Sequence, residues 1–248
     1  MCTALVSISA DPDVPVLLLG TRDEFTDRRW IPPARWWRGA FDGVLGGYDV
    51  QAGGTWLAVH PERRLVAMVL NGPDAAGPVR GGRSRGRLPL ITVTGGDPFQ
   101  PALLRSTRPF HLLRLSLAGA SLGSWDGRTL RRQEIGPGVH VVGNTGLDRQ
   151  DDSRTSAALR WLGERPRPKV DRARPAEECW GPWLSLLGRE PSPDGSGDGI
   201  VVREAHGDRI HATLAVSAVA LSPRHARYDF GQPLGTGTFM PLTWRRVL

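Results

Sequence analysis

Paired strand-forming segments joined by short turns are the feature of this sequence that most restricts its fold. Residues 3–10 (TALVSISA) and 14–20 (VPVLLLG) are rich in Val, Leu and Ile, and a turn-forming Asp-Pro-Asp separates them. Residues 56–60 and 65–70 repeat the pattern around a Pro-Glu-Arg-Arg turn. Each pair predicts an antiparallel hairpin, and the near-continuous apolarity of the first pair predicts burial on both of its faces.

The rest of the chain alternates between strand-forming and helix-forming stretches. Further strands are predicted at 110–117, 122–127, 139–144, 199–205, 209–221, 226–231 and 237–244. Helices are predicted at 151–165, with Asp152 or Ser153 as N-cap, at 175–190, where Gly181-Pro182 kinks or splits the helix, and more weakly at 100–106. This order predicts an α+β fold, with helices packed on the faces of largely antiparallel sheets.

The length of the chain fits one large domain. We therefore take residues 1–248 as a single domain, with a flexible loop at 189–199, where Pro, Ser, Gly and Asp dominate. No apolar run reaches about 18 residues, so we expect no membrane-spanning helix. Residues 1–15 lack the basic start of a secretory signal, which favours a cytoplasmic location.

The cysteines and histidines are few and scattered. Two cysteines do not make a disulfide framework, and the six histidines show no zinc-ligand spacing. We therefore expect neither a metal nor another cofactor.

The net charge of +7 raises the question of a nucleic-acid partner. The basic residues are almost all arginines, with Lys169 the only lysine, and they are spread along the chain, as in proteins from GC-rich genomes. The densest cluster, RGGRSRGR at 80–87, is predicted to be a solvated loop, with an RNA contact as the alternative. The distribution of charge argues against nucleic acid as the main partner.

Cys2 directly follows Met1 and precedes the first predicted strand. Methionine aminopeptidase removes Met1 when the next side chain is small, and Cys2 then carries a free α-amine that can act as the base for its own thiol. Arg22 is expected to face Cys2 across the first hairpin and to lower the pKa of the thiol below its free value. Asp23 would hold the α-amine or orient Arg22.

An acyl-transfer site also needs donors for the oxyanion of a tetrahedral intermediate. Asn71 and Asn144 follow predicted strands and are the candidate donors. Both have a structural alternative, since Asn at a strand end is often a turn former. Cys179 is predicted to be a small buried residue of a helix.

Several motifs occur in an order that resembles the NRDE family, the homologues of transport and Golgi organisation protein two. They lie within the first 150 residues or so and read MCTALVSI, LLLGTRDEFTDRRW, GGYDVQAGGTWLAVH, AMVLNG, RSRGRL and VVGNTGLD. The family is named for Asn-Arg-Asp-Glu, and this chain has Thr21-Arg22-Asp23-Glu24 in that place, so that the first position differs.

The family in turn resembles the N-terminal nucleophile hydrolases, which implies a four-layer αββα sandwich of two mainly antiparallel sheets with helices outside. The resemblance implies that Cys2 is the nucleophile, that Arg22 and Asp23 flank it, that Asn71 is an oxyanion donor and that Asn144 is a second polar contact. Those hydrolases also use an arginine on a late strand. Residues 210–221 contain none, so Arg203, Arg209 or another arginine would have to replace it.

Two functions stay open on this evidence. One is a hydrolase that acts on an amide or acyl thioester of a hydrophobic acid through a Cys2 acyl-enzyme, with a small hydrophobic acyl or amide ligand as its partner. The other is a non-enzymatic carrier or chaperone for haem, a lipid or an acyl-CoA in the same cleft, with Cys2 as a haem-iron ligand or a plain strand residue. RNA binding through residues 80–87 is a third, weaker alternative.

Overall fold

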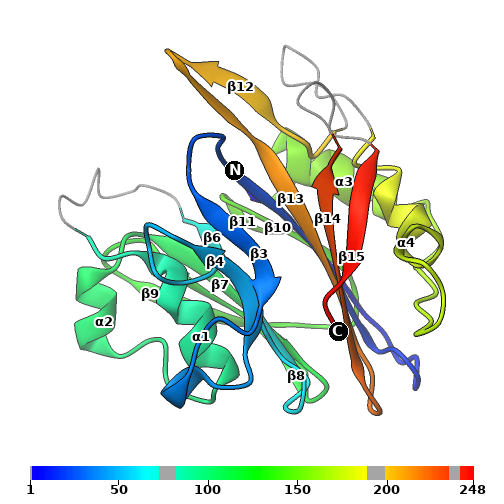
Figure 1. The fold of residues 1–248 in the computed structure, drawn as a ribbon, viewed down its shortest axis with the longest axis horizontal. Helices are drawn as coiled ribbons and strands as arrows, with labels where there is room; N and C mark the ends of the chain where they lie inside the picture. Colours follow the sequence, from blue (N-terminus) through cyan, green and yellow to red (C-terminus); the bar gives the residue numbers. More distant parts are fainter. Residues whose placement is uncertain (1, 73–81, 189–198, 235–240) are drawn as a thin grey trace.

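The computed structural model describes residues 2–72, 82–188, 199–234 and 241–248. Two antiparallel sheets face each other, and helices cover the outer side of each (Figure 1). The predicted flexible loop at 189–199 lies outside the described residues except for Gly199.

Sheet A contains the two ends of the chain. Its strands, in spatial order, are β11 (Gly146–Leu147), β10 (Gly138–Gly143), β1 (Ala4–Ile8), β2 (Val16–Phe25), β13 (Arg209–Leu221), β14 (Ala226–Pro233) and β15 (Leu242–Arg246), and β12 (Arg203–His206) pairs with β13. All of these pairs are antiparallel. The predicted first hairpin is β1–β2, and its strands lie near the centre of the sheet.

Sheet B is built from the middle of the chain. Its strands, in spatial and sequence order, are β3 (Trp30–Ala34), β4 (Leu45–Asp49), β5 (Leu57–His60), β6 (Leu65–Asn71), β7 (Phe110–Ser116), β8 (Gly119–Trp125) and β9 (Leu130–Ile135). The predicted second hairpin is β5–β6. Each strand pairs with the next along the chain, so sheet B is a meander.

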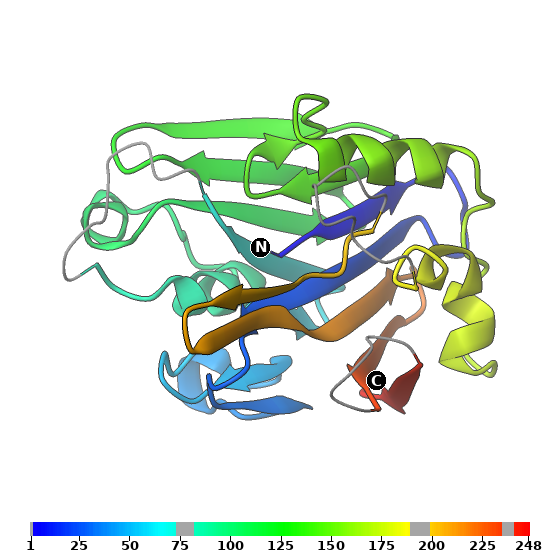
Figure 2. The same cartoon turned by 90° about the horizontal axis from the view of Figure 1, so that it is seen from above.

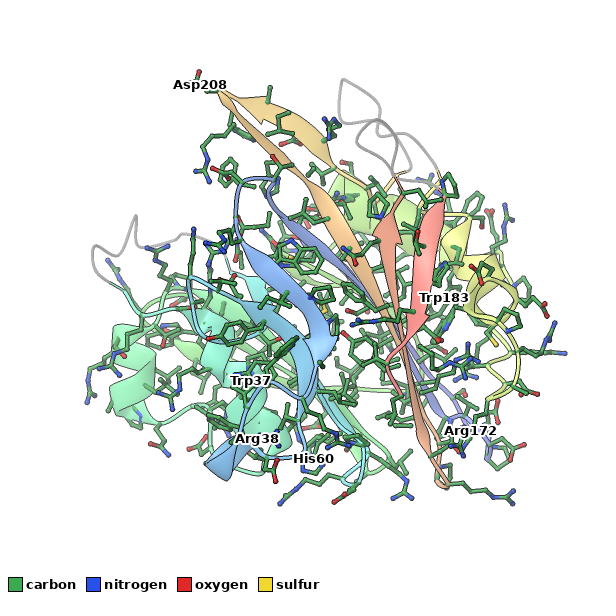
Figure 3. The ribbon with its side chains drawn as sticks, in the orientation of Figure 1. Trp37, Arg38, His60, Arg172, Trp183 and Asp208 are labelled. Atoms are coloured by element: carbon green, nitrogen blue, oxygen red, sulfur yellow. The ribbon has the colours of Figure 1, made fainter. Side chains whose placement is uncertain are left out.

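In the described part of the chain, four α-helices complete the layers. They are α1 (Leu88–Val93) and α2 (Pro101–Ser106) on sheet B, and α3 (Ser153–Gly163) and α4 (Ala176–Leu184) on sheet A; two short 3₁₀ helices are η1 (Gly39–Phe41) and η2 (Arg85–Arg87). Trp183 lies buried between α4 and sheet A, whereas Trp37 belongs to the outer layer of sheet B (Figure 3). The predicted αββα sandwich is confirmed.

The first hairpin shows why both faces of a central strand are apolar. Leu17 and Leu19 pack into the layer under α3 and α4, whereas Val16 and Leu18 pack against sheet B. Because side chains alternate along a strand, a strand between two packed layers needs apolar residues at successive positions. The sequence prediction ends this strand at residue 20, but β2 continues to Phe25.

The helical predictions are largely confirmed. Asp152 is the N-cap of α3 and its side chain accepts a hydrogen bond from the Thr155 amide at 2.8 Å. Pro182 lies within α4 and does not split it, since the helix runs on to Leu184. The six-residue helix α1 was not predicted, because its sequence LPLITV carries the β-branched residues that favour strands.

The arginine-rich segment is solvated only in part over its described residues, 82–87, where Arg83 and Arg87 are exposed. Gly86 is buried, and a Cβ at Gly54 would come within 2.4 Å of its backbone. Arg85 donates a hydrogen bond to the Pro109 carbonyl at 2.9 Å. These contacts make the segment part of the packed structure, because only glycine lets two backbones approach so closely. Among the described residues, no helix combines the length and apolarity needed to cross a bilayer.

A candidate catalytic site at Cys2

Cys2 lies just before β1, between the two strands that pair with β1. Ala4 pairs with Gly20 of β2 and with Val142 of β10, and the Thr21 amide donates to the Thr3 carbonyl at 2.9 Å. The β1–β2 register continued by two residues sets Cys2 opposite Arg22, whereas β10 ends at Gly143 and Asn144 lies in the turn that follows. Figure 2 shows β1 starting near the middle of the molecule, with β2 between it and β13.

The Cys2 thiol contacts the backbone of Asp23. The Asp23 amide donates to Cys2 Sγ at 3.4 Å, and Sγ lies 3.7 Å from the Asp23 carbonyl oxygen. The side chain is partly buried and packs against the core between the two sheets. A backbone N–H directed at sulfur fixes the position of the thiol and favours its anionic form.

The pKa of the Cys2 thiol is nevertheless raised above its ordinary value. Burial is the main cause, and the negative charge of Asp23 adds to it, whereas Arg22 lowers the pKa by a smaller amount. Burial disfavours the thiolate because the charge loses its hydration. The prediction that Arg22 brings the thiol pKa below its free value is therefore wrong for this arrangement.

Arg22 is held in an aromatic cage between the sheets. Its guanidinium carbon lies 4.6 Å from the ring centroid of Trp56 and 5.3 Å from that of Trp30. The residue is only 3% exposed, and Nη2 is 3.5 Å from Asp49 Oδ2. Cation–π contact and an ion pair together keep this buried guanidinium in place beside Cys2.

Asp49 is the residue that orients Arg22, and sequence reasoning missed it. Arg28 binds its carboxylate through Nε at 2.8 Å and Nη2 at 3.1 Å. The amides of Gln51 and Ala52 donate to Oδ1 at 3.1 and 3.0 Å. Such an Asp-capped turn has a sequence signal, since Asp49 precedes the Gly53-Gly54 pair.

The Asp23 carboxylate points to the other side of sheet A, toward α3. Its Oδ1 accepts a hydrogen bond from Thr213 Oγ1 at 2.7 Å, and its Oδ2 lies 3.6 Å from Arg154 Nη1. Thr213 Oγ1 in turn accepts from the Val202 amide at 2.9 Å. Asp23 therefore does not orient Arg22 through its side chain.

The arginine beside Asp23 comes from a helix and not from a late strand. Arg154 lies in the first turn of α3. Arg209 forms an ion pair with Asp27 at 2.8 Å on the exposed β12–β13 hairpin, and Arg203 is exposed on β12. The arginine beside the Asp23 carboxylate is thus Arg154, which the sequence did not single out.

Asn144 occupies the turn between β10 and β11. Its carbonyl oxygen lies 3.0 Å from His111 Nε2, and His111 Nδ1 lies 2.7 Å from Ser124 Oγ. Burial lowers the pKa of His111, so the ring is neutral, donates to Asn144 and accepts from Ser124. Asn144 Oδ1 is buried and has no hydrogen-bond partner among the residues that the structure describes.

Asn71 is not brought to Cys2 by any described contact. It ends β6, pairs with Phe110 and is exposed. Strand alternation places it on the face of Val69, which packs toward the helices and away from sheet A. The structure therefore brings together Cys2, Arg22 and the Asp23 backbone, leaves Asn71 on another face, and shows no contact between Cys2 and Asn144 among the described residues.

No cation site accompanies this arrangement in the described part of the chain, where no group of three or more His, Cys, Asp or Glu could hold a metal ion. The predicted Cys179 is fully buried in α4.

Comparisons with known proteins identify the family. No curated protein matches the chain. A solved structure of the Caenorhabditis elegans N-acylethanolamine-hydrolyzing acid amidase ortholog is similar, with a TM-score of 0.49 and 11% identity over 88% of this chain and 92% of that one. Residues 1–178 match the family described as Transport and Golgi organisation 2, as the sequence motifs predict. The chain belongs to the Transport and Golgi organisation 2 family.

Proposed function

We propose that this protein is an N-terminal-cysteine hydrolase that cleaves an amide or an acyl thioester of a hydrophobic acid. The observation that carries the proposal is the position of the Cys2 thiol. Its sulfur accepts a hydrogen bond from the Asp23 amide at 3.4 Å, and the β1–β2 register, continued to residue 2, sets Cys2 opposite Arg22. The apolar core around Cys2, with Trp30 and Trp56 nearby, supports a hydrophobic acyl group as the part of the substrate that is bound.

The mechanism requires Cys2 to carry the free α-amine. The amine takes the thiol proton, and the sulfur attacks the carbonyl carbon to give a tetrahedral intermediate. The resulting ammonium returns its proton to the leaving amine or thiol as the carbon–nitrogen or carbon–sulfur bond breaks. Water then hydrolyses the Cys2 thioester, with the same amine as base, and releases the acid.

Asn144 is the better placed of the two predicted oxyanion donors. It lies in the turn that directly follows β10, the strand that pairs with β1, whereas Asn71 ends a strand of the other sheet. A side-chain amide fixed at a strand end can direct an N–H group at a developing oxyanion. The raised pKa of the thiol makes the base more important, because little thiolate exists at neutral pH without it.

The proposal is tested by the N-terminus and by turnover. Intact-mass measurement should show that Met1 is absent from the purified protein, and a panel of acyl thioesters and N-acyl amides should contain a substrate. Cys2→Ala should abolish turnover, whereas Cys179→Ala, which removes the other thiol of the chain, should retain it. Retention of Met1, or turnover that survives Cys2→Ala, would refute the mechanism.

A second candidate is a non-enzymatic carrier of haem, a lipid or an acyl-CoA. The observation that favours it is the raised thiol pKa, since a neutral, partly buried thiol is a poor nucleophile. Titration with haem and with an acyl-CoA, followed by absorbance and calorimetry, separates the two candidates. Saturable binding by a protein that turns over no member of the substrate panel would favour the carrier.

A further inference from the structure

A groove of about 670 Å³ lies on the outer face of sheet B, on the far side of that sheet from Cys2. Strands β7, β8 and β9 form its floor, and the segment between α1 and α2 forms one wall. In Figure 1 these elements lie on the opposite side of the molecule from α3 and α4. The volume is in the range of small-ligand sites.

The groove exists because the helices cover only part of the sheet. The Phe99 ring lies directly over Gly123, since a Cβ at Gly123 would come within 2.2 Å of it. Gly123 pairs with Leu112 on one side and Arg132 on the other, so Phe99 covers this row of the sheet. The next row consists of Arg114, Ser121 and Glu134. These side chains line the groove, and Arg114 and Glu134 are exposed.

Three arginines from separate elements line the groove, namely Arg63, Arg114 and Arg132. None of them forms an ion pair with another residue in the described ranges. Two acids also line the groove, and one of them, Asp97, accepts the Phe99 amide at 2.9 Å in a local turn. The other acid, Glu134, stands in the same row as Arg114, so the three arginines exceed the two acids by one charge, and this excess favours an anion.

Two of these arginines are placed to share one anionic group. Arg114 and Arg132 stand two strands apart and are offset by two residues, which corresponds to about 12 Å between Cα atoms. Side chains of this length can converge over the Ser121 position between them. The Arg132 guanidinium already lies over the groove, with its carbon 4.4 Å from the Phe99 ring centroid. A guanidinium binds the oxygens of phosphate or carboxylate in pairs.

Apolar side chains line the groove beside the arginines. Phe99 and Leu65 contribute to the lining, and Leu117 is 40% exposed. An exposed large apolar side chain next to arginines without ion pairs indicates a ligand that has an apolar part and an anionic group. We propose that the groove binds an organic anion whose phosphate or carboxylate meets Arg114 and Arg132 and whose apolar part lies against Phe99 and Leu117.

The experiment uses 1-naphthyl phosphate and 1-naphthoate as probes, titrated calorimetrically into the full chain at low salt. At least one should bind saturably and more tightly than inorganic phosphate or 1-naphthol, and the tighter of the two identifies the anionic group. The double variant Arg114→Ala/Arg132→Ala should weaken binding at least about ten-fold. Arg128→Ala, at an exposed arginine in the β8–β9 turn, removes one positive charge outside the groove and should leave binding unchanged.

Two further measurements keep this result independent of the hydrolase proposal. Cys2→Ala should bind the probes as tightly as the unaltered chain, and thermal unfolding should show that the double variant is folded. Absence of saturable binding of both probes, or an equal loss in Arg128→Ala, would overturn the groove as an anion site. Neither result would alter the expectation for turnover at Cys2.

Discussion

Arg22 and Asp23 are neighbours in sequence, but their side chains lie on opposite faces of sheet A. The Arg22 guanidinium stacks on Trp56 between the two sheets, whereas the Asp23 carboxylate accepts a hydrogen bond from Thr213 on the side of α3. This follows from the alternation of side chains along β2. The two consecutive charges therefore do not act as one pair. Arg22 belongs to the layer that contains Cys2, whereas Asp23 acts on Cys2 through its backbone hydrogen bond and through the negative charge of its carboxylate.

The buried ion pair of Arg22 predicts a large loss of stability in Arg22→Ala. This variant leaves part of the Asp49 carboxylate uncompensated and removes the guanidinium that packs on the rings of Trp30 and Trp56, so the free energy of unfolding should fall by about 3 kcal/mol or more. Urea unfolding measures it. Arg38→Ala is the matched control, because its ion pair with Asp42 is exposed and should contribute less than about 1 kcal/mol. A similar loss of unfolding free energy in both variants would contradict a stabilising role for the contacts of Arg22 with Asp49 and the two tryptophans.

Asp23→Asn should lower the pKa of the Cys2 thiol. The Asp23 charge is the second cause, after burial, that raises this pKa, and Asn keeps the side-chain shape while removing the charge. The rate of alkylation by iodoacetamide, measured from pH 6 to 10, reports the thiolate fraction. The variant should react at lower pH than the unaltered chain. Cys179 is fully buried, so Cys2→Ala gives the background rate. If the pH midpoint of the alkylation rate stayed the same or rose, the Asp23 charge would not influence the pKa of the thiol.

Local sequence signals account for most of the fold. Apolar runs separated by turn residues define the β1–β2 and β5–β6 hairpins, because burial on both faces needs successive apolar side chains. The Asp152 cap defines the start of α3 in the same way. The exceptions are short elements such as α1, where a β-branched sequence is helical because it packs on β6.

The candidate site was only half predictable. The first hairpin brings Arg22 opposite Cys2 by local pairing, which a sequence can indicate. Asp49, at the end of β4, reaches Arg22 between the sheets, and Arg154, from α3, reaches Asp23 on the opposite face of sheet A; such contacts depend on how distant layers are stacked. For the same reason the sequence could not tell that Asn71, at the end of a predicted strand, faces away from Cys2.

The buried His111 should make the folded chain less stable at acidic pH. Burial lowers its pKa in the folded chain, so between pH 6.5 and the lowered value the unfolded chain binds a proton that the folded chain does not. The free energy of unfolding should therefore fall as the pH decreases below about 6.5. In His111→Gln this contribution is absent, and the loss should be smaller than in the unaltered chain. Urea unfolding at several pH values between 4.5 and 7.5 measures the difference; parallel curves would refute it.

The close contact between Gly47 and Trp56 should connect the packing of sheet B to the reactivity of the Cys2 thiol. A Cβ at Gly47 would lie 1.9 Å from Trp56 Cη2, so Gly47→Ala must displace the indole on which Arg22 stacks. We expect a loss of about 1–3 kcal/mol in the free energy of unfolding, as for overpacked cores, together with a changed rate of Cys2 alkylation. Gly163→Ala, at the end of α3, is the control, because a Cβ there meets nothing within 4 Å. If Gly47→Ala lost stability but left the alkylation rate unchanged, the position of Trp56 would not influence the thiol.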